Sequence, residues 1–261
     1  MVRERRSGAD DDDLDVSQVH GIHAVRALLT NDPQRVRVLY VQRGRRDKRI
    51  GTLMDRAREA GIRIEVVDKH WLDRRCEGSH QGVVVDSVEL ALADESVLET
   101  ELGRFPKPPL LLVLDGVTDP RNLGACLRCA NAAGVDAVLL PKRHSAPLNA
   151  VALKTAAGGA ESLLLVEVTN LARRLNWLQD QGIWIIGAAS AGEHLWTTVD
   201  LTVGCAVVVG SEDKGLRALT ARCCDQLVHI PMLGEVSSLN VSVATGILLF
   251  EAVRQRGLAS G

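Results

Sequence analysis

The sequence predicts an α/β protein with a small amino-terminal α/β domain and a larger carboxy-terminal domain built on a parallel sheet. From residue 109 onward, continuous apolar runs alternate with helical stretches, which is the pattern of a parallel sheet covered on both faces. Residues 17–86 alternate shorter strand and helix signals, and a charged stretch ending in prolines follows them. We therefore divide the chain into a solvated tail (1–16), a small domain (17–88), a linker (89–108) and a large domain (109–258).

The first 88 residues contain the tail and the elements of the small domain. The opening MVRERRSGADDDDLD is charged and has no apolar core after it, so we do not expect a secretory signal. Charged and apolar residues alternate over 35–41, as in a half-buried strand, and helical spacing over 48–61 ends at a glycine. Two more strands and a short helix are predicted at 62–68, 81–90 and 70–78.

The second half of the chain contains six buried-strand signals. They lie at 110–117, 137–141, 163–168, 183–189, 205–210 and 227–232. Helical stretches follow most of them, at 122–134, 149–159, 170–182 and 216–224. After the last strand, a polar loop leads into an apolar helix that carries no charge between Glu235 and Glu251. Such a helix is expected to be buried on several sides.

Composition excludes some classes of protein and leaves others open. The 261 residues carry a net charge of −2, and no apolar run is long enough for a membrane span. Residues 17–86, however, contain fourteen Lys and Arg against nine Asp and Glu. Many of them lie in RVRVLYVQRGRRDKRI, which predicts either contacts with a polyanion or a solvated face.

Six cysteines and no signal sequence favour free thiols over a disulfide framework. Cys126 and Cys129 have a zinc-like spacing, but they lie on a predicted helix, and the second pair, Cys223 and Cys224, is adjacent. We therefore expect these cysteines to pack in the interior and expect no metal site.

Three polar loops follow apolar strands of the large domain. Their sequences are DGVTDPRNLGACLR, GSEDKG and LGEVSSLN. In parallel sheets, ligands bind beyond the carboxyl ends of the strands, so these loops are expected to converge. The sequence has no phosphate-binding GxxxxGK[ST] and no GxGxxG after the first strand, so it does not indicate a P-loop or nicotinamide enzyme.

These loops resemble the three motifs of the SpoU/TrmH methyltransferases, a branch of the SPOUT class. VHGIHAV, HQGVVV and PKRHSAPLNAVALKTAAGGAES also resemble that family, so the similarity spans residues 18 to 256. The sequence is still more similar to those members that methylate the 2′-hydroxyl of a guanosine in large-subunit (23S) ribosomal RNA. The resemblance implies S-adenosyl-L-methionine as cofactor, ribosomal RNA as partner, a homodimer and a cytoplasmic location, with no membrane.

The resemblance also implies a fold. The large domain would be a SPOUT domain with a deep trefoil knot, which composition alone does not predict because knots are rare. The small domain would be an RNA-binding module similar to the L7Ae-like ribosomal proteins.

The same resemblance implies roles for individual residues. Five would be catalytic: Asn122, Arg128, Glu212, Ser238 and Asn240. Three would contact the cofactor, largely through main-chain atoms: Gly210, Ile230 and Leu239. Because an arginine side chain normally stays protonated, Arg128 is better suited to stabilising a developing alkoxide than to removing a proton.

Structural explanations remain open for each of these residues. Asn122 and Asn240 suit helix caps, and Ser238 suits a turn. Arg128 would extend from an apolar helix to solvent, Glu212 would be a surface acid near a turn, and Ile230 and Leu239 would be ordinary core residues.

The basic cluster supplies the candidates for RNA phosphate contacts. They are Arg43, Arg45, Arg46, Lys48 and Arg49. With aromatic residues at only 3% of the chain, shape, phosphate and 2′-hydroxyl recognition are expected to matter more than base stacking. His20, His23 and His80 lie outside the three loops, so we expect structural or RNA-contacting roles for them.

The second motif departs from the family pattern in one respect. Members often have glycine after the motif glutamate, whereas Asp213 follows Glu212 here. This leaves the conformation of that loop open. Two alternatives therefore remain beside the 23S enzyme: a 2′-O-methyltransferase acting on transfer RNA or another ribosomal site, and a catalytically silent RNA-binding assembly factor.

Overall fold

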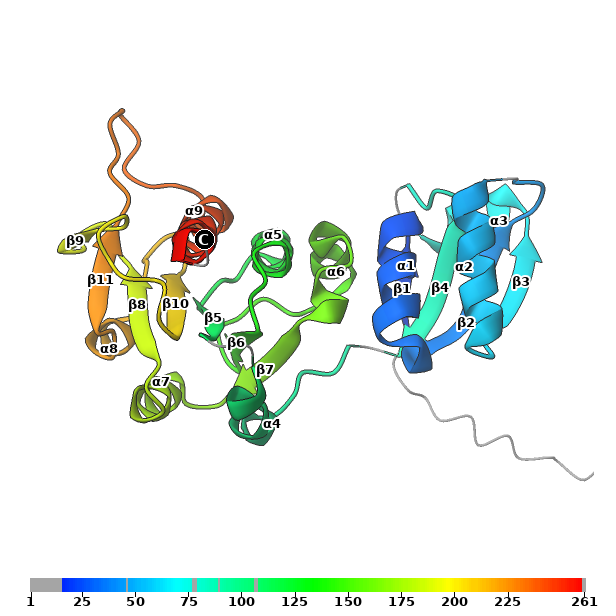
Figure 1. Ribbon diagram of the computed structural model, residues 1–261. Coiled ribbons are helices and arrows are strands. Elements are labelled where there is room, and N and C mark those ends of the chain that lie inside the picture. The colour runs from blue at the N-terminus through cyan, green and yellow to red at the C-terminus, as the bar shows by residue number, and fades with distance from the viewer. Residues whose placement is uncertain (1–15, 46, 77–78, 89, 106–107, 260–261) are drawn as a thin grey trace, which may run out of the picture.

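Two α/β units form the protein, and the segment that connects them packs against the second (Figure 1). The computed structural model describes residues 16–45, 47–76, 79–88, 90–105 and 108–259. The predicted tail and Arg46 lie outside these residues, except that Val16 already belongs to the first strand. The domain boundaries themselves stay a prediction.

The amino-terminal unit is a four-stranded sheet in the order β1-β4-β2-β3, with only β2 and β3 parallel. Its elements are β1 (Val16–His20), α1 (Ile22–Asn31), η1 (Pro33–Arg35), β2 (Val36–Gln42), α2 (Lys48–Glu59), β3 (Arg63–Val67), α3 (Lys69–Arg75) and β4 (Val83–Val88). The strand and helix signals of 35–88 are thus all present. The separate elements β1 and α1 had not been assigned from the sequence.

Both faces of this small sheet are covered. Helices α1 and α2 pack on one face through Val25, Leu28 and Leu53, which are almost completely buried. Helix α3 covers part of the other face, where Leu72 packs against Tyr40. Side chains alternate between the faces along each strand, so each strand contributes to both layers.

The connecting segment is an ordered part of the second unit. It contains α4 (Glu95–Glu101) and η2 (Leu102–Arg104), and Leu98 is fully buried in the core of the large sheet. Just before α4, Ala93 bonds to the edge strand, donating its N–H to Leu165 O at 2.8 Å and accepting from Glu167 N at 2.8 Å. Of the predicted linker, the part from Ala93 to η2 is therefore fixed to the sheet.

The carboxy-terminal unit is a seven-stranded parallel sheet in the order β7-β6-β5-β10-β8-β11-β9. Its strands are β5 (Leu110–Asp115), β6 (Ala137–Pro141), β7 (Leu164–Val168), β8 (Trp184–Ala188), β9 (His194–Leu195), β10 (Cys205–Gly210) and β11 (Gln226–His229). This confirms the six predicted strands and the parallel sheet. The two-residue β9 was not predicted.

Helices cover both faces of the sheet, as the sequence predicts. One face carries α5 (Pro120–Ala132), α6 (Ala150–Ala156) and α9 (Val241–Ala259). The other carries α4, α7 (Leu171–Asp180) and α8 (Ala218–Arg222); the short 3-10 turn η3 (Ala160–Ser162) follows α6. Among the described helices, none is both long and apolar enough to cross a membrane.

Close packing of α5 on α6 depends on Gly124. A Cβ atom at this position would lie 2.3 Å from the carbonyl oxygen of Ala152 and 2.7 Å from Cβ of Thr155. Any side chain would therefore push the two helices apart. The other neighbour of α5 is α9, where the Cys126 thiol lies 3.5 Å from the Thr245 hydroxyl.

Candidate functional site

The three polar loops meet at one edge of the large sheet, where side-chain hydrogen bonds join them. Asn122, in the first turn of α5, donates from Nδ2 to Glu212 Oε1 at 2.6 Å. Its Oδ1 atom accepts from Asn240 Nδ2 at 2.9 Å. These partners lie 90 and 118 residues away from Asn122 in the sequence, so only the tertiary fold brings them together. We call the chain Asn240–Asn122–Glu212 the three-loop bridge.

The structure shows which of the two asparagines of the bridge also caps a helix. Asn122 is not the cap of α5, because Asp119 precedes the helix and accepts from the backbone N–H of Arg121 at 2.8 Å. Asn240 does cap α9, since its Oδ1 accepts from Ser242 N at 2.9 Å. Its Nδ2 is left for Asn122, so one amide both starts the helix and joins the bridge.

The loop after β10 is closed on itself. Ser211 and Gly215 exchange two backbone hydrogen bonds of 3.0 and 2.9 Å. Gly215 has φ +64, a conformation that glycine adopts without strain. A Cβ on Gly210 would lie 2.0 Å from the carbonyl carbon of Gly215, so the turn can fold back this closely only over a glycine. Asp213 is exposed at the tip of this closed turn.

An ion pair with a buried carboxylate anchors the same loop to the first motif, and it was missed in the sequence. Asp115, at the end of β5, is fully buried and accepts from Arg217 N at 2.9 Å and from Arg217 Nε at 2.5 Å. Asp115 is also the strand partner of Gly210. An acid that ends the apolar run LLLVLD was the available signal, because a buried carboxylate needs a charged or hydrogen-bonding partner.

A cavity of about 550 Å³ opens beside the bridge. Its walls come from the ends of β8, β10 and β11, the loops after them and the first turns of α9. The lining includes all three residues predicted to contact the cofactor, Gly210, Ile230 and Leu239, together with Glu212 and Ser238. The volume is in the range of small-molecule sites, and the walls mix apolar side chains with polar ones. A nucleoside-sized ligand fits this description.

Arg128 is the predicted catalytic residue that lies outside both the bridge and the cavity. Six residues separate it from Asn122, which places it about 120° further round the helix. Its side chain is exposed, does not line the cavity and makes no ion pair or hydrogen bond with any described residue. The charge is therefore free for a ligand or a second chain.

The predicted phosphate-binding residues lie in and after the loop that follows β2, in the amino-terminal unit. Arg43, Arg45, Lys48 and Arg49 are exposed. Arg49 is held by Asp47, with a 2.8 Å contact between Arg49 Nη2 and Asp47 Oδ2. None of these residues lines the cavity.

The three histidines considered earlier take different positions. His80 is buried, with Nε2 3.0 Å from Asp73 Oδ1 and Nδ1 accepting from Gly82 N at 2.9 Å, which is a structural role. Burial is the main cause that lowers the pKa of His20, with the charge of Lys154 adding to it. His23 is exposed.

The cysteines near the site are interior thiols. Burial raises the pKa of Cys126 to about 12, so this thiol stays neutral near pH 7. No group of three or more His, Cys, Asp or Glu side chains within the described ranges is arranged to hold a metal ion.

Comparison with protein families gives two matches. Residues 109–250 match the SpoU rRNA methylase family, and residues 18–90 match the RNA 2′-O ribose methyltransferase substrate-binding family. The first match covers the large sheet and all members of the three-loop bridge.

Individual proteins resemble nearly the whole chain. The 23S rRNA (guanosine-2′-O-)-methyltransferase RlmB of Yersinia pestis is 51% identical, over 92% of this chain and 98% of its own length. RlmB of Escherichia coli K12 is 48% identical, over 91% and 98%. Among solved structures, the SpoU methyltransferase AviRb of Streptomyces viridochromogenes in complex with AdoMet is 25% identical, with a TM-score of 0.77, covering 94% of this chain and 91% of AviRb.

Proposed function

The chain belongs to the SpoU rRNA methylase family, and on that basis we propose that it transfers a methyl group from S-adenosylmethionine to the 2′-hydroxyl of a guanosine in 23S ribosomal RNA. The observation that carries the proposal is the three-loop bridge beside the cavity. It joins one polar residue from each motif at the carboxyl edge of the sheet, where parallel sheets bind their ligands.

The residues around the cavity fit S-adenosylmethionine. Gly210 has no side chain to obstruct the approach of a ligand to the backbone, and Ile230 and Leu239 provide apolar walls. The cofactor supplies a methyl group activated by its sulfonium charge. The protein therefore has to orient the ribose and stabilise the charge that develops on its oxygen.

Orientation of the ribose is assigned to the bridge and to Ser238. Both ends of the Asn122 amide are hydrogen-bonded, which fixes its position. Oε2 of Glu212 has no hydrogen-bond partner among the described residues, so it is open to a substrate hydroxyl. The side chain of Ser238 is exposed in the loop that lines the cavity, where it can hydrogen-bond a ribose.

Charge stabilisation is assigned to Arg128. Loss of the hydroxyl proton leaves an alkoxide, which a positioned cation stabilises. A guanidinium group that pairs with no described residue is available both for this oxygen and for a neighbouring phosphate. Arg128 lies apart from the bridge of its own chain. In a dimer, an arginine from the second subunit can provide the positive charge that the bridge lacks.

We also propose that the protein is a homodimer. Val243 and Phe250 lie on one face of α9 and are each 49% exposed, and Val253 beside them is 38% exposed. An exposed apolar helix face of this kind is typical of a self-complementary interface. A cytoplasmic location is part of the proposal, because ribosomal RNA is the substrate. The trefoil knot and the L7Ae-like small domain stay predictions.

The test is transfer of labelled methyl groups from S-adenosylmethionine to deproteinised 23S RNA. Alkali-resistant 2′-O-methylguanosine should appear with the unchanged protein and fall about 100- to 1000-fold with Asn240→Ala or Arg128→Ala. Arg222→Ala, an exposed arginine on α8, is the control and should keep full activity. Methyl transfer to a base nitrogen would contradict the proposal.

Two alternatives are separated by the same assay. Labelling of transfer RNA in preference to 23S RNA would assign the enzyme to another substrate. An assembly factor without activity would bind RNA but show no heat of binding when titrated with S-adenosylmethionine. The closed second-motif loop around Gly215 argues against this last alternative, because Asp213 does not prevent the turn from forming.

A further inference from the structure

The carboxyl edge of the large sheet is divided into two halves. Every residue that lines the cavity comes from β8, β10, β11, the loops that follow them, or α9. None comes from β5, β6 or β7, which form the other half of the sheet. Of the loops at the ends of these three strands, those after β6 and β7 belong neither to the cavity nor to the three-loop bridge.

The loop after β6 carries three consecutive exposed residues that can be cationic, Lys142, Arg143 and His144. Lys142 is paired with Glu167 on β7, at 3.2 Å between Nζ and Oε2. Arg143 makes no ion pair or side-chain hydrogen bond with any described residue. Its charge is thus not neutralised by any residue that the structure describes.

This loop is fixed next to the methyl-transfer site. The N–H of Ala146 donates to Val117 O at 2.7 Å, which ties the loop to the segment leading into the first motif. A Cβ on Gly116 would lie 3.7 Å from the carbonyl oxygen of His144 and 3.9 Å from Cβ of Ser211. Gly116 thus lies between the β6 loop and the second-motif loop.

His144 has an unusual backbone conformation. Its φ is +63, a left-handed conformation that costs energy in any residue other than glycine. The loop is anchored on both sides, since Lys142 N donates to Val168 O at 2.9 Å and Ala146 N to Val117 O. Strain that is retained in an anchored, exposed loop points to a functional constraint on the direction of its side chains.

We infer that residues 142–144 bind the sugar–phosphate backbone of the RNA next to the target nucleotide, with Arg143 as the main phosphate ligand. Two strand spacings, about 10 Å, separate the end of β6 from Gly210 on β10. Arg143 therefore reaches a neighbouring phosphate and not the reacting ribose. The planar guanidinium matches a phosphate group in two-point contact. This inference rests on the proposed function.

The experiment compares Arg143→Ala with Arg222→Ala in the full-length protein, using deproteinised 23S RNA. Arg143→Ala should raise the KM for RNA about tenfold and leave kcat nearly unchanged, because the contact is equal in the ground and transition states. The slope of log affinity against log salt should become about 0.7 less negative, which is the loss of one phosphate contact on single-stranded RNA. S-adenosylmethionine affinity, measured by calorimetry, should not change.

A second variant tests the strained position. His144→Gly should raise the thermal midpoint, since glycine tolerates the left-handed conformation, and should also raise the KM for RNA. Unchanged KM and unchanged salt slope in both variants, or a fall in kcat alone, would overturn the inference. If the protein without substitutions bound RNA but did not methylate it, the proposed function would be contradicted. The salt slope of RNA binding would still test the role of Arg143.

Discussion

At the scale of single residues, the site depends on amide and carboxylate side chains that are hydrogen-bonded or ion-paired to residues of other loops. Asn122 bonds at both ends, Asn240 divides its two amide atoms between a helix cap and the bridge, and Asp115 is paired with Arg217. Each partner comes from a different loop. A change in one of them therefore moves the other motifs.

Replacement of Glu212 separates its charge from its position. Glu212→Gln keeps an oxygen that can accept from Asn122 Nδ2, whereas Glu212→Ala leaves that donor without a partner. If Glu212 mainly positions Asn122, kcat should fall no more than about tenfold in the first variant and about 100-fold or more in the second. Equal and large losses in single-turnover assays would show that the carboxylate charge itself is required.

Gly210→Ala tests the close turn over the cavity. The new methyl group would lie 2.0 Å from backbone carbon of Gly215, so the loop must move and the cofactor should bind at least tenfold more weakly. Gly103→Ala, where no atom lies within 4 Å, is the control. Calorimetric titration with S-adenosylmethionine measures both, and equal affinities would contradict the assigned role of Gly210.

The sequence predicted the members of the bridge but not their connections. Resemblance to known motifs identified Asn122, Glu212 and Asn240, and the cofactor residues Gly210, Ile230 and Leu239 all line the cavity. The partner of Asp115 could not be read from the chain, because Arg217 lies 102 residues away. Separation of this size leaves no local pattern in the sequence.

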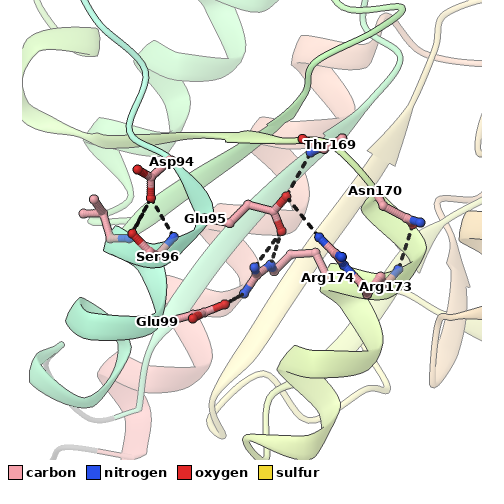
Figure 2. Close-up of polar contacts among 9 residues, drawn as sticks. Asp94, Glu95, Ser96, Glu99, Thr169, Asn170, Arg173 and Arg174 are labelled. Carbon is pink, nitrogen blue, oxygen red and sulfur yellow. Dashed lines mark hydrogen bonds and ion pairs between the residues drawn. The ribbon is translucent and has the colours of Figure 1, made fainter.

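At the scale of elements, the connecting segment is held by a cluster of charges around the buried Arg174 (Figure 2). Arg174 on α7 donates to Glu95 Oε2 from Nε at 2.8 Å and from Nη2 at 2.6 Å, and its Nη1 lies 2.9 Å from Glu99. Glu95 also accepts from the N–H of Thr169 at 3.0 Å. Helix α4 is thereby fixed to α7 and to the end of β7.

Glu95 makes the stability of this attachment depend on pH. Burial acts to raise the pKa of Glu95, but the Thr169 N–H and Arg174 outweigh it, so the pKa is lowered. The stabilisation is present above the ordinary glutamate pKa of about 4.3 and is lost as the pH falls through the lowered value. Urea unfolding should therefore show Glu95→Gln less stable than the unchanged protein at pH 7 and nearly equal to it once Glu95 is protonated.

Glu99→Gln is the matched control, because the Glu99 side chain is 48% exposed and its one ion pair with a described residue is with Arg174. Its effect at pH 7 should be smaller than that of Glu95→Gln. A Glu95→Gln difference that stays constant from pH 7 to the acid limit would contradict the role assigned to the ionised carboxylate.

The apolar face of α9 predicts the oligomeric state. Phe250→Glu places a charge on that face and should convert the dimer to a monomer in light scattering coupled to size exclusion, with loss of methyl transfer. Leu219→Glu is the control, since Leu219 is 61% exposed on α8, on the opposite face of the sheet. A monomer in the unchanged protein would refute the proposed homodimer.

Elements with a strong periodic pattern were predicted, and those without one were not. The six long apolar strands and the helices between them follow from hydrophobic pattern alone. The two-residue β9 is too short to have a pattern, and α4 lies in the charged stretch that was expected to be a linker. Its attachment depends on Arg174 and on the β7 edge, which are distant in sequence.

At the scale of the whole molecule, one set of expected RNA contacts lies outside the unit that holds the cofactor cavity. The exposed basic residues after β2 belong to the amino-terminal sheet, while the cavity belongs entirely to the carboxy-terminal one. The triple variant Arg43→Glu, Arg45→Glu and Lys48→Glu should therefore weaken RNA binding. The slope of log affinity against log salt should become about 2 less negative. Calorimetry should find S-adenosylmethionine affinity unchanged, and a parallel loss of both would contradict the division.

The strand order has a consequence for folding during synthesis. Strand β5 pairs with β10, so the centre of the sheet can form only after Cys205, the partner of Leu110, has been synthesised. The bridge likewise requires Asn240, just before the final helix. A chain that ends before α9 lacks Asn240's helix and the part of the cavity wall formed by Val241, Ala244 and Leu248. The proposed methyl-transfer site can therefore be completed only after the last helix has been synthesised.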